Sequence, residues 1–179
     1  MTVRSRGCTD HGGRAMVRPM ERSCRSWGEF AAAEPEMAEA GRRLFTQFGP
    51  GLAFLATVGS DLRPRLHPIT IALAAEELYA FITPGPKLDD LRRGGAYALH
   101  AFLPDEVEEE FMIAGYAVRG EPRERDAALA AYHVASVPDD HVLMRFVLDR
   151  ALHAAYRHRG DWPPTYRRWS AASTSPVEA

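Results

Sequence analysis

The sequence is poor in cysteine, which disfavours disulfide scaffolds, dithiol redox pairs and zinc sites. It has two cysteines in 179 residues, Cys8 and Cys24, and they do not form a Cys-x-x-Cys pair. That spacing matches no common metal or redox motif. We interpret both side chains as free thiols and expect a cytoplasmic protein.

Long apolar runs and an excess of charge of one sign are missing as well. No run approaches the roughly 20 apolar residues that span a bilayer, so we expect no membrane partner. The formal net charge is −2 at pH 7, which gives no general attraction for nucleic acid. No apolar segment follows the N-terminal arginines, which argues against a secretory signal.

Several motifs of catalysis and nucleotide binding are also absent from the sequence. No Gly-x-Gly-x-x-Gly follows a predicted strand, which disfavours a Rossmann nucleotide fold. There is no Gly-x-Ser-x-Gly nucleophile elbow and no His-Glu-x-x-His zinc motif. The sequence therefore identifies no catalytic acid or base and no metal site.

The informative part of the chain lies between Gly51 and His100. Phe54–Val58, Arg63–Ile71 and Leu78–Ile82 carry apolar or alternating patterns that are typical of strands. Gly59-Ser60-Asp61 has turn chemistry, and Thr83-Pro84-Gly85-Pro86 ends the third strand. Further strands are predicted at Ala96–Phe102, Glu110–Val118, Val142–Leu148 and Ala151–Arg157, the last two joined at Asp149-Arg150.

Three helices are predicted around these strands. Lys87–Arg93 begins a short basic helix, and Arg123–Ala135 is rich in helix formers. Glu36–Phe48 follows Pro35 and stops at Gly49-Pro50. Its expected apolar face consists of Met37, Ala40, Leu44 and Phe48, with Trp27 and Phe30 anchoring its entry.

The chain is expected to form one domain with two flanking segments. Residues 1–25 have almost no large apolar side chains and predict a disordered arm. Residues 26–160 form the predicted domain, and residues 161–179 a C-terminal tail. About seven strands with hairpin-like spacing predict a mostly β fold, an antiparallel closed or split barrel with peripheral helices.

Two basic side chains suggest a site for an anionic group. Lys87 stands in the first turn of its helix, where backbone N–H groups and the helix dipole favour a phosphate. Arg65 comes from a neighbouring strand and Thr83 adds a hydroxyl. The alternative is that Lys87, Arg92 and Arg93 form a solvated face.

The remaining polar residues give weaker signals. His67 and His100 lie inside strand patterns and are interpreted as structural residues or as contacts at the edge of a ligand. Four further histidines, at positions 133, 141, 153 and 158, have no partner that the sequence identifies. Asp89-Asp90 and Glu108–Glu110 are adjacent carboxylates whose side chains diverge, and we interpret them as solvated charge.

Taken in order, these segments resemble the pyridoxamine 5'-phosphate oxidase-like proteins of the FMN-binding split-barrel superfamily. The resemblance covers about Trp27 to Trp169. It rests on Trp27–Phe30, Phe54–Val58, Pro64–Pro68, Lys87–Leu91, Gly95–His100 and Phe111–Ala117.

The resemblance implies a homodimer with FMN at the subunit interface and a small-molecule substrate that exchanges hydride through flavin N5. By matching positions, the cofactor is expected to contact Arg65, Leu66, His67, Phe81, Ile82, Thr83 and Lys87, with Trp169, or alternatively Trp162, reaching it from the partner subunit.

One departure from the family pattern bears on the substrate. The Arg-x-x-His signature of authentic pyridoxamine phosphate oxidases is absent, because the tail reads Tyr166-Arg167-Arg168-Trp169. Oxidation of vitamin B6 is therefore not expected. Family resemblance leaves two alternatives open: a reductase that uses a deazaflavin coenzyme, and a non-catalytic protein that carries flavin or haem.

Overall fold

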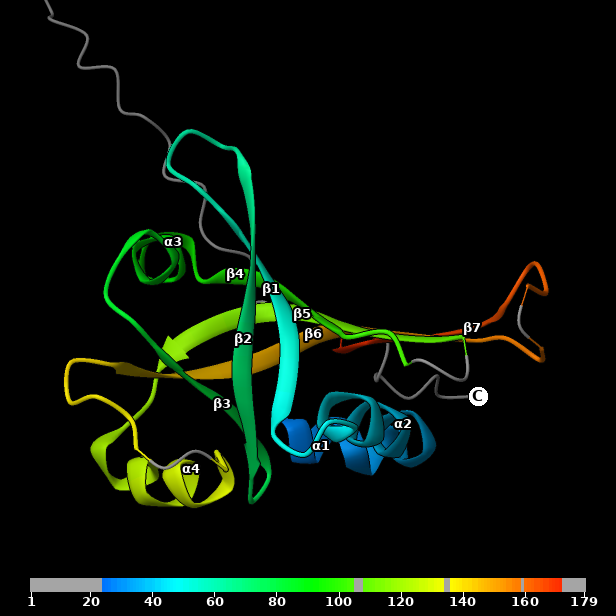
Figure 1. Cartoon of the computed structure of the whole chain (residues 1–179), viewed down its shortest axis with the longest axis horizontal. Helices are drawn as coiled ribbons and strands as arrows, with labels where there is room; N and C mark the ends of the chain where they lie inside the picture. Colours follow the sequence, from blue (N-terminus) through cyan, green and yellow to red (C-terminus); the bar gives the residue numbers. More distant parts are fainter. Residues whose placement is uncertain (1–23, 105–107, 134–135, 159, 172–179) are drawn as a thin grey trace, which may run out of the picture.

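The computed structural model describes residues 24–104, 108–133, 136–158 and 160–171, which form seven strands and four α-helices (Figure 1). The strands are β1 (Gly51–Val58), β2 (Pro64–Ala74), β3 (Glu77–Ile82), β4 (Ala96–Ala101), β5 (Glu109–Arg119), β6 (Val142–Ala155) and β7 (Thr165–Ser170). The helices are α1 (Trp27–Ala33), α2 (Pro35–Thr46), α3 (Pro86–Gly94) and α4 (Arg125–Ala131), and a 3-10 turn at Pro122–Glu124 precedes α4.

The strands pair in the order β3-β2-β1-β4-β5-β6-β7, and a further pairing between β3 and β6 closes the sheet. Every pairing is antiparallel. The result is a closed barrel of six strands with β7 outside it, which confirms the predicted mostly β, split-barrel class. In Figure 1, α1 and α2 lie together on one side of the barrel, and α3 and α4 occupy separate places around it.

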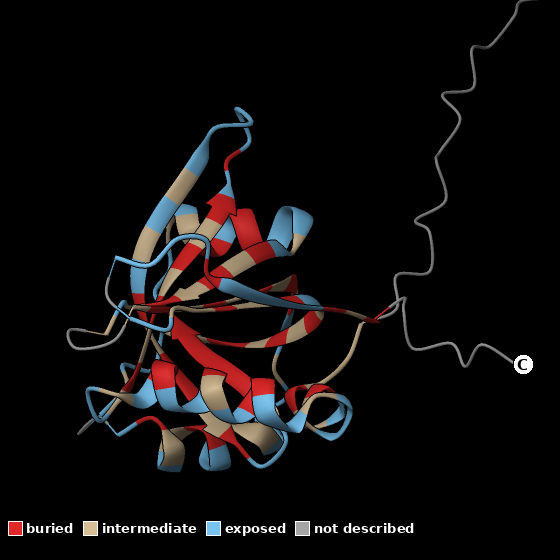
Figure 2. Ribbon diagram, turned by 90° about the vertical axis from the view of Figure 1, so that its right-hand side faces the viewer, coloured by how far each residue is buried: buried red, intermediate tan, exposed pale blue. Residues whose placement is uncertain are grey.

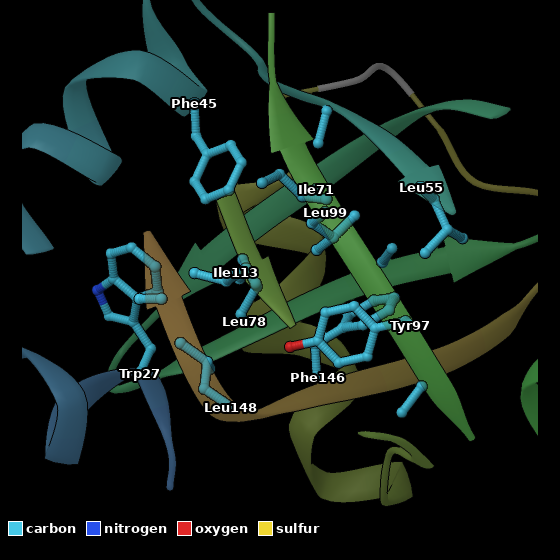
Figure 3. Close-up of a cluster of buried hydrophobic side chains, with 14 of the residues drawn as sticks. Trp27, Phe45, Leu55, Ile71, Leu78, Tyr97, Leu99, Ile113, Phe146 and Leu148 are labelled. Carbon is cyan, nitrogen blue, oxygen red and sulfur yellow. The ribbon is translucent and has the colours of Figure 1, made fainter. Parts of the chain in front are cut away.

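The barrel encloses one large hydrophobic core. Alternation along each strand sends every second side chain inward, and Figure 2 shows the resulting pattern of buried and partly exposed residues. Leu55, Leu78, Leu99, Ile113 and Phe146 are fully buried and converge inside the barrel (Figure 3).

The two N-terminal helices cover one side of this core with an aromatic cluster. Trp27 of α1 contacts Phe45 of α2 and Phe111 of β5, with ring centroids 6.2 Å apart in both pairs. Phe111 also contacts Phe30 at 6.5 Å and Phe45 at 5.4 Å. The two predicted anchors therefore lie in a helix of their own, capped by Ser26.

The predicted face of α2 is partly wrong. The helix ends at Thr46, two residues before the predicted end at Phe48. Met37 and Leu44 are buried as expected, but Phe45 takes the inner position and Phe48 is exposed.

The predicted break at Asp149-Arg150 is also wrong, because β6 runs unbroken from Val142 to Ala155. The register against β5 shifts between Ala114 and Gly115, and this leaves Asp149 as an extra residue in the strand. A β-bulge therefore accommodates a pair of polar residues that resembled a turn. Gly115 permits the bulge, since a Cβ there would collide with the backbone carbonyl of Val147.

The ends of the chain contribute more structure than their composition indicates. Arg25, at the end of the predicted arm, forms a two-bond backbone bridge with Leu148. Within the predicted tail, β7 pairs with β6 from Thr165 to Ser170. Residues 1–23 and 172–179 lie outside the described residues.

A carboxylate predicted to be solvated ties α2 to the barrel. Glu109 is buried, and both of its oxygens accept hydrogen bonds from Arg43 Nη2, at 2.7 and 2.6 Å. His153 Nε2, on β6, lies 2.7 Å from Glu109 Oε1. Burial raises the pKa of Glu109, but the hydrogen bonds with Arg43 and His153 outweigh burial and leave the pKa below its ordinary value.

Candidate functional site

The seam between β2 and β3 is paired over only part of its length. Strand β2 pairs with β1 from Pro64 to Ile71, but it pairs with β3 only from Ala72 to Ala74. Before Ala72 the strands β2 and β3 diverge, and the edge of β2 faces a cavity. Pro64 and Pro68 lack backbone N–H donors, which protects such an edge against pairing with another strand.

A cavity of about 260 Å³ lies where the two strands separate. Its polar side chains include Thr83, Lys87 and His141, and its apolar wall includes Phe81 and Ile69. The other lining residues are Pro68, Thr70, Tyr132, Ser136, Val137 and Pro138. The Tyr132 hydroxyl donates to the carbonyl oxygen of Thr70 at 3.1 Å and so closes part of the open edge.

Three of the residues predicted to contact a cofactor line this cavity, namely Phe81, Thr83 and Lys87. Ile82 does not, because its side chain points into the barrel core. Leu66 lies on the outer face of β2 and is 65% exposed.

Lys87 is the cation best placed to bind an anion in this cavity. Burial lowers the pKa of Lys87 below its ordinary value. No salt bridge involves Lys87 within the part of the chain that the structure describes. The residue stands in the first turn of α3, a helix of nine residues that begins at Pro86. A partly buried ammonium beside free helical N–H groups favours an anion.

Arg65, which was predicted to share one anion with Lys87, is paired with a carboxylate in the structure. Its guanidinium donates to Asp90, with Nη1 at 3.1 Å from Oδ2. Thr57 Oγ1 on β1 donates to the same carboxylate oxygen at 3.0 Å. Asp90 is 4% exposed, so its interpretation as solvated charge is wrong: it fastens α3 to two strands of the barrel.

His67 lies close enough to both cations to respond to them. Burial lowers the pKa of His67, and the charges of Lys87 and Arg65 lower it further, whereas Asp90 raises it. Its Nε2 atom is buried and has no hydrogen-bond partner among the described residues. A neutral imidazole with two cations nearby makes this end of the barrel receptive to an anion.

A group that sequence reasoning missed completes the cavity wall. His141 Nε2 lies 2.9 Å from the hydroxyl oxygen of Thr83, and His141 Nδ1 lies 3.0 Å from Asp140 Oδ1. His141 immediately precedes β6, and Thr83 immediately follows β3. The pairing of β3 with β6 brings the two together, and no spacing in the sequence could have indicated it.

Several residues singled out in the sequence lie away from this cavity. Trp169 is 7% exposed, with its ring 5.0 Å from that of Phe30 in the core of its own chain. Trp162 is exposed, near β7. His100 Nδ1 lies 2.6 Å from the carbonyl oxygen of Ala101, a contact that fits the structural interpretation of this histidine.

A second cavity, of about 370 Å³, lies between α2, β1, β2 and the end of α4. It is larger than the first but contains none of the predicted site residues; its polar walls come from Arg42, Thr46 and His133. We place the candidate site at the smaller cavity, where unpaired positive charge and an open strand edge coincide.

The described residues hold neither a metal cluster nor a membrane-spanning helix. Over residues 24–104, 108–133, 136–158 and 160–171, no group of three or more His, Cys, Asp or Glu side chains is arranged to hold a metal ion. None of the helices in these ranges is both long and apolar enough to cross a membrane.

The sequence matches no protein-family model and no curated protein. The fold, in contrast, is similar to that of several solved structures. A haem-binding protein from Mycobacterium smegmatis aligns with a TM-score of 0.58 at 16% identity over 74% of this chain, although the aligned part is only 58% of that protein.

Two other structures align over most of their own length. A protein of the pyridoxinephosphate oxidase family from Clostridium acetobutylicum, related to general stress protein 26, gives a TM-score of 0.51 at 12% identity, over 80% of this chain and 95% of that one. A FAD-binding protein from Mesorhizobium loti gives 0.50 at 18% identity, over 63% and 89%. The chain therefore has the split-barrel fold of the pyridoxamine 5'-phosphate oxidase-like and flavin-binding proteins, as its motifs indicated.

Proposed function

We propose that this protein is a cytoplasmic, FMN-binding oxidoreductase that transfers hydride between flavin N5 and a small-molecule substrate. The observation that carries the proposal is Lys87, an unpaired and partly buried cation at a helix N-terminus beside the open edge of β2. The fold of proteins described as FAD-binding or as pyridoxinephosphate oxidase-like supports it.

The residues of the cavity suit the phosphate end of the cofactor. Lys87 supplies a fixed positive charge, and Thr83 a hydroxyl that lines the same cavity. Charge-assisted hydrogen bonds of this kind are the strong ones in phosphate sites. Arg65 is paired with Asp90, so we assign it the role of holding α3, and with it Lys87, against the barrel rather than that of a free charge.

The rest of the cofactor would lie along the open edge of β2, where Pro68, Ile69 and Thr70 line the cavity. Phe81 offers it an apolar surface. When bound, FMN supplies the hydride chemistry; the chain's own residues bind it, orient it and exclude water.

We also propose that the working form is a homodimer with the cofactor at the interface. A cavity of about 260 Å³ is smaller than the roughly 300–1,000 Å³ of complete ligand sites, so a second chain would have to supply the remaining wall. The outward side chains of β1, β4 and β5 stay partly exposed although they are mostly apolar. They include Phe54, Ala56, Ala98, Met112 and Ala114.

The first experiment is the absorbance spectrum of the purified protein. Bands of oxidised flavin would support FMN, whereas a Soret band would point to haem. A colourless protein that binds neither FMN nor a deazaflavin coenzyme on titration would refute the proposal.

The second experiment tests the phosphate position with Lys87→Ala. Loss of one charge-assisted hydrogen bond is worth about 1.5–3 kcal/mol, so FMN affinity should fall roughly ten- to hundred-fold. Riboflavin, which lacks the phosphate, should bind nearly as before. Arg92→Ala is the matched control, because it removes a positive charge from the exposed face of the same helix.

Titration by fluorescence quenching would measure both variants after light scattering has confirmed their dimeric state. An equal loss of FMN affinity in Lys87→Ala and Arg92→Ala would mean that only the general field of α3 matters. A monomer mass near 20 kDa (the chain is 19.9 kDa) for the wild type would contradict the composite site.

A further inference from the structure

A chain of hydrogen bonds leads from Thr83 and His141, which line the cavity beside Lys87, to Asp140 outside it. Thr83 Oγ1 and His141 Nε2 are 2.9 Å apart, and His141 Nδ1 and Asp140 Oδ1 are 3.0 Å apart. The His141 side chain is 20% exposed, whereas that of Asp140 is mostly exposed. Both imidazole nitrogens therefore have protein partners, and the ring is fixed between them.

The partners of His141 determine which nitrogen carries the proton. An ionised carboxylate only accepts hydrogen bonds, so His141 Nδ1 must donate to Asp140. In the neutral imidazole Nε2 is then an acceptor. The hydroxyl of Thr83 must donate its proton to Nε2, and its oxygen presents only lone pairs to the cavity. In this state Thr83 repels a phosphate oxygen.

Protonation of His141 exchanges donor and acceptor in the hydrogen bond between His141 Nε2 and the Thr83 hydroxyl. Both nitrogens of an imidazolium are donors, so Nε2 donates to the oxygen of Thr83. The Thr83 O–H group is then free to point into the cavity and to donate to an anion beside Lys87. The opposite neutral tautomer does not achieve this, because it would place a nitrogen lone pair against the Asp140 carboxylate.

We propose that His141 is a positioning residue that couples the binding of a phosphate group at Thr83 and Lys87 to the uptake of one proton. The inference rests on the proposed function in one respect: it takes the FMN phosphate as the natural ligand of this cavity. The binding step balances as one phosphate and one proton taken up, the proton residing on His141 Nε2.

Other charged groups around the cavity must be separated from this effect. Lys87 faces it from α3, and Tyr132 from the end of α4, where burial raises the pKa of the phenol. Arg125 lies against the ring of Phe81, with its guanidinium carbon 5.0 Å from the centroid. His67, close to Lys87, can also gain a proton when an anion arrives. Only a comparison of wild type with a variant of His141 isolates the proposed proton.

The experiment measures FMN affinity by fluorescence quenching between about pH 5 and pH 8, the range in which imidazoles titrate. The variants are His141→Gln, which cannot titrate, and Asp140→Asn, which removes the charge that favours the imidazolium. His158→Gln, an exposed histidine near β7, is the control. The phosphate of FMN itself titrates near pH 6, at about the value for phosphorylated side chains, and does so equally in all four proteins.

We expect the ratio of wild-type to His141→Gln affinity for FMN to rise by about tenfold from the alkaline to the acidic end, the value of one charge-assisted hydrogen bond. The test is the change of this ratio with pH, because the amide of Gln can itself donate to Thr83 at every pH. In Asp140→Asn the gain should move to lower pH, and His158→Gln should follow the wild type. If FMN affinity changes with pH in the same way in wild type and His141→Gln, and both bind FMN, the inference is overturned and the proposed function stays intact.

A second measurement does not depend on flavin. Inorganic phosphate, titrated into the wild-type protein, should raise the pKa of the imidazole whose NMR resonance is absent in His141→Gln. If phosphate does so in a chain that binds no flavin, the proposed function fails and the coupling stands. If neither phosphate nor FMN moves that titration, the coupling is wrong.

Discussion

The buried carboxylate of Glu109 offers a quantitative test of how α2 is held to the barrel. Glu109→Gln keeps the shape of the side chain but removes the charge that Arg43 and His153 contact at 2.6–2.7 Å. Hydrogen bonds to a charged group are worth about 1.5–3 kcal/mol. Because the Arg43 side chain is more than half exposed and can be rehydrated, we expect a loss near the lower end, about 1.5–2 kcal/mol.

The effect should depend on pH with a definite sign. The pKa of Glu109 lies below its ordinary value of 4.5 in the folded chain, so the folded state binds its proton less readily than the unfolded state. The stabilisation is complete above the unfolded pKa and is lost as the pH falls through the folded pKa. The gap between wild type and Glu109→Gln should therefore be full at neutral pH and should close in acid.

Urea denaturation at several pH values would measure the gap directly. Thermal unfolding would show a Tm lower by roughly 3–8 °C at neutral pH, at about 2–4 °C per kcal/mol for a chain of this size. Glu110→Gln is the control, because its side chain lies on the opposite face of β5. Equal unfolding free energies for Glu109→Gln and Glu110→Gln, with no difference in their pH dependence, would refute the role assigned to Glu109.

Three further substitutions test the packing. Phe111→Ala, in the aromatic cluster, should cost about 3–5 kcal/mol in the free energy of unfolding, and a loss below that of Glu109→Gln would contradict the cluster's importance. Gly115→Ala should cost about 1–3 kcal/mol, because its Cβ meets backbone atoms of Val147 and its neighbours; an unchanged denaturation midpoint would show that the bulge relaxes. Asp90→Ala should destabilise by about 1–3 kcal/mol through lost bonds to α3, β1 and β2, and hydrogen exchange should quicken in α3 before the barrel, whereas uniform protection would argue against a fastening role.

The strands could be predicted because their signals are local. Alternation from Glu110 to Val118 and the turn residues at Gly59-Ser60-Asp61 reflect a pleated chain with one face in a core, and the structure places β5 and the β1–β2 turn there. Local signals failed where tertiary pairing overrode them. Asp149 resembled a turn residue but is a bulge opposite Gly115. The exposed, charged strand β7 carried no apolar alternation, since only one of its residues, Trp169, is buried.

The candidate site also contains some residues that the local sequence predicted and others that only the tertiary structure brought together. The sequence by itself predicted Lys87 as the cation, because a lysine after a proline at the start of a helix has a local reason to favour an anion. Thr83 was expected for its nearby hydroxyl, and Phe81 from the family resemblance. Barrel closure decided the rest. Pairing of β3 with β6 brought His141 to Thr83, and docking of α3 brought Asp90 to Arg65. These partners are separated by 58 and 25 positions in the chain, and contacts across such separations depend on strand register, which no local pattern encodes.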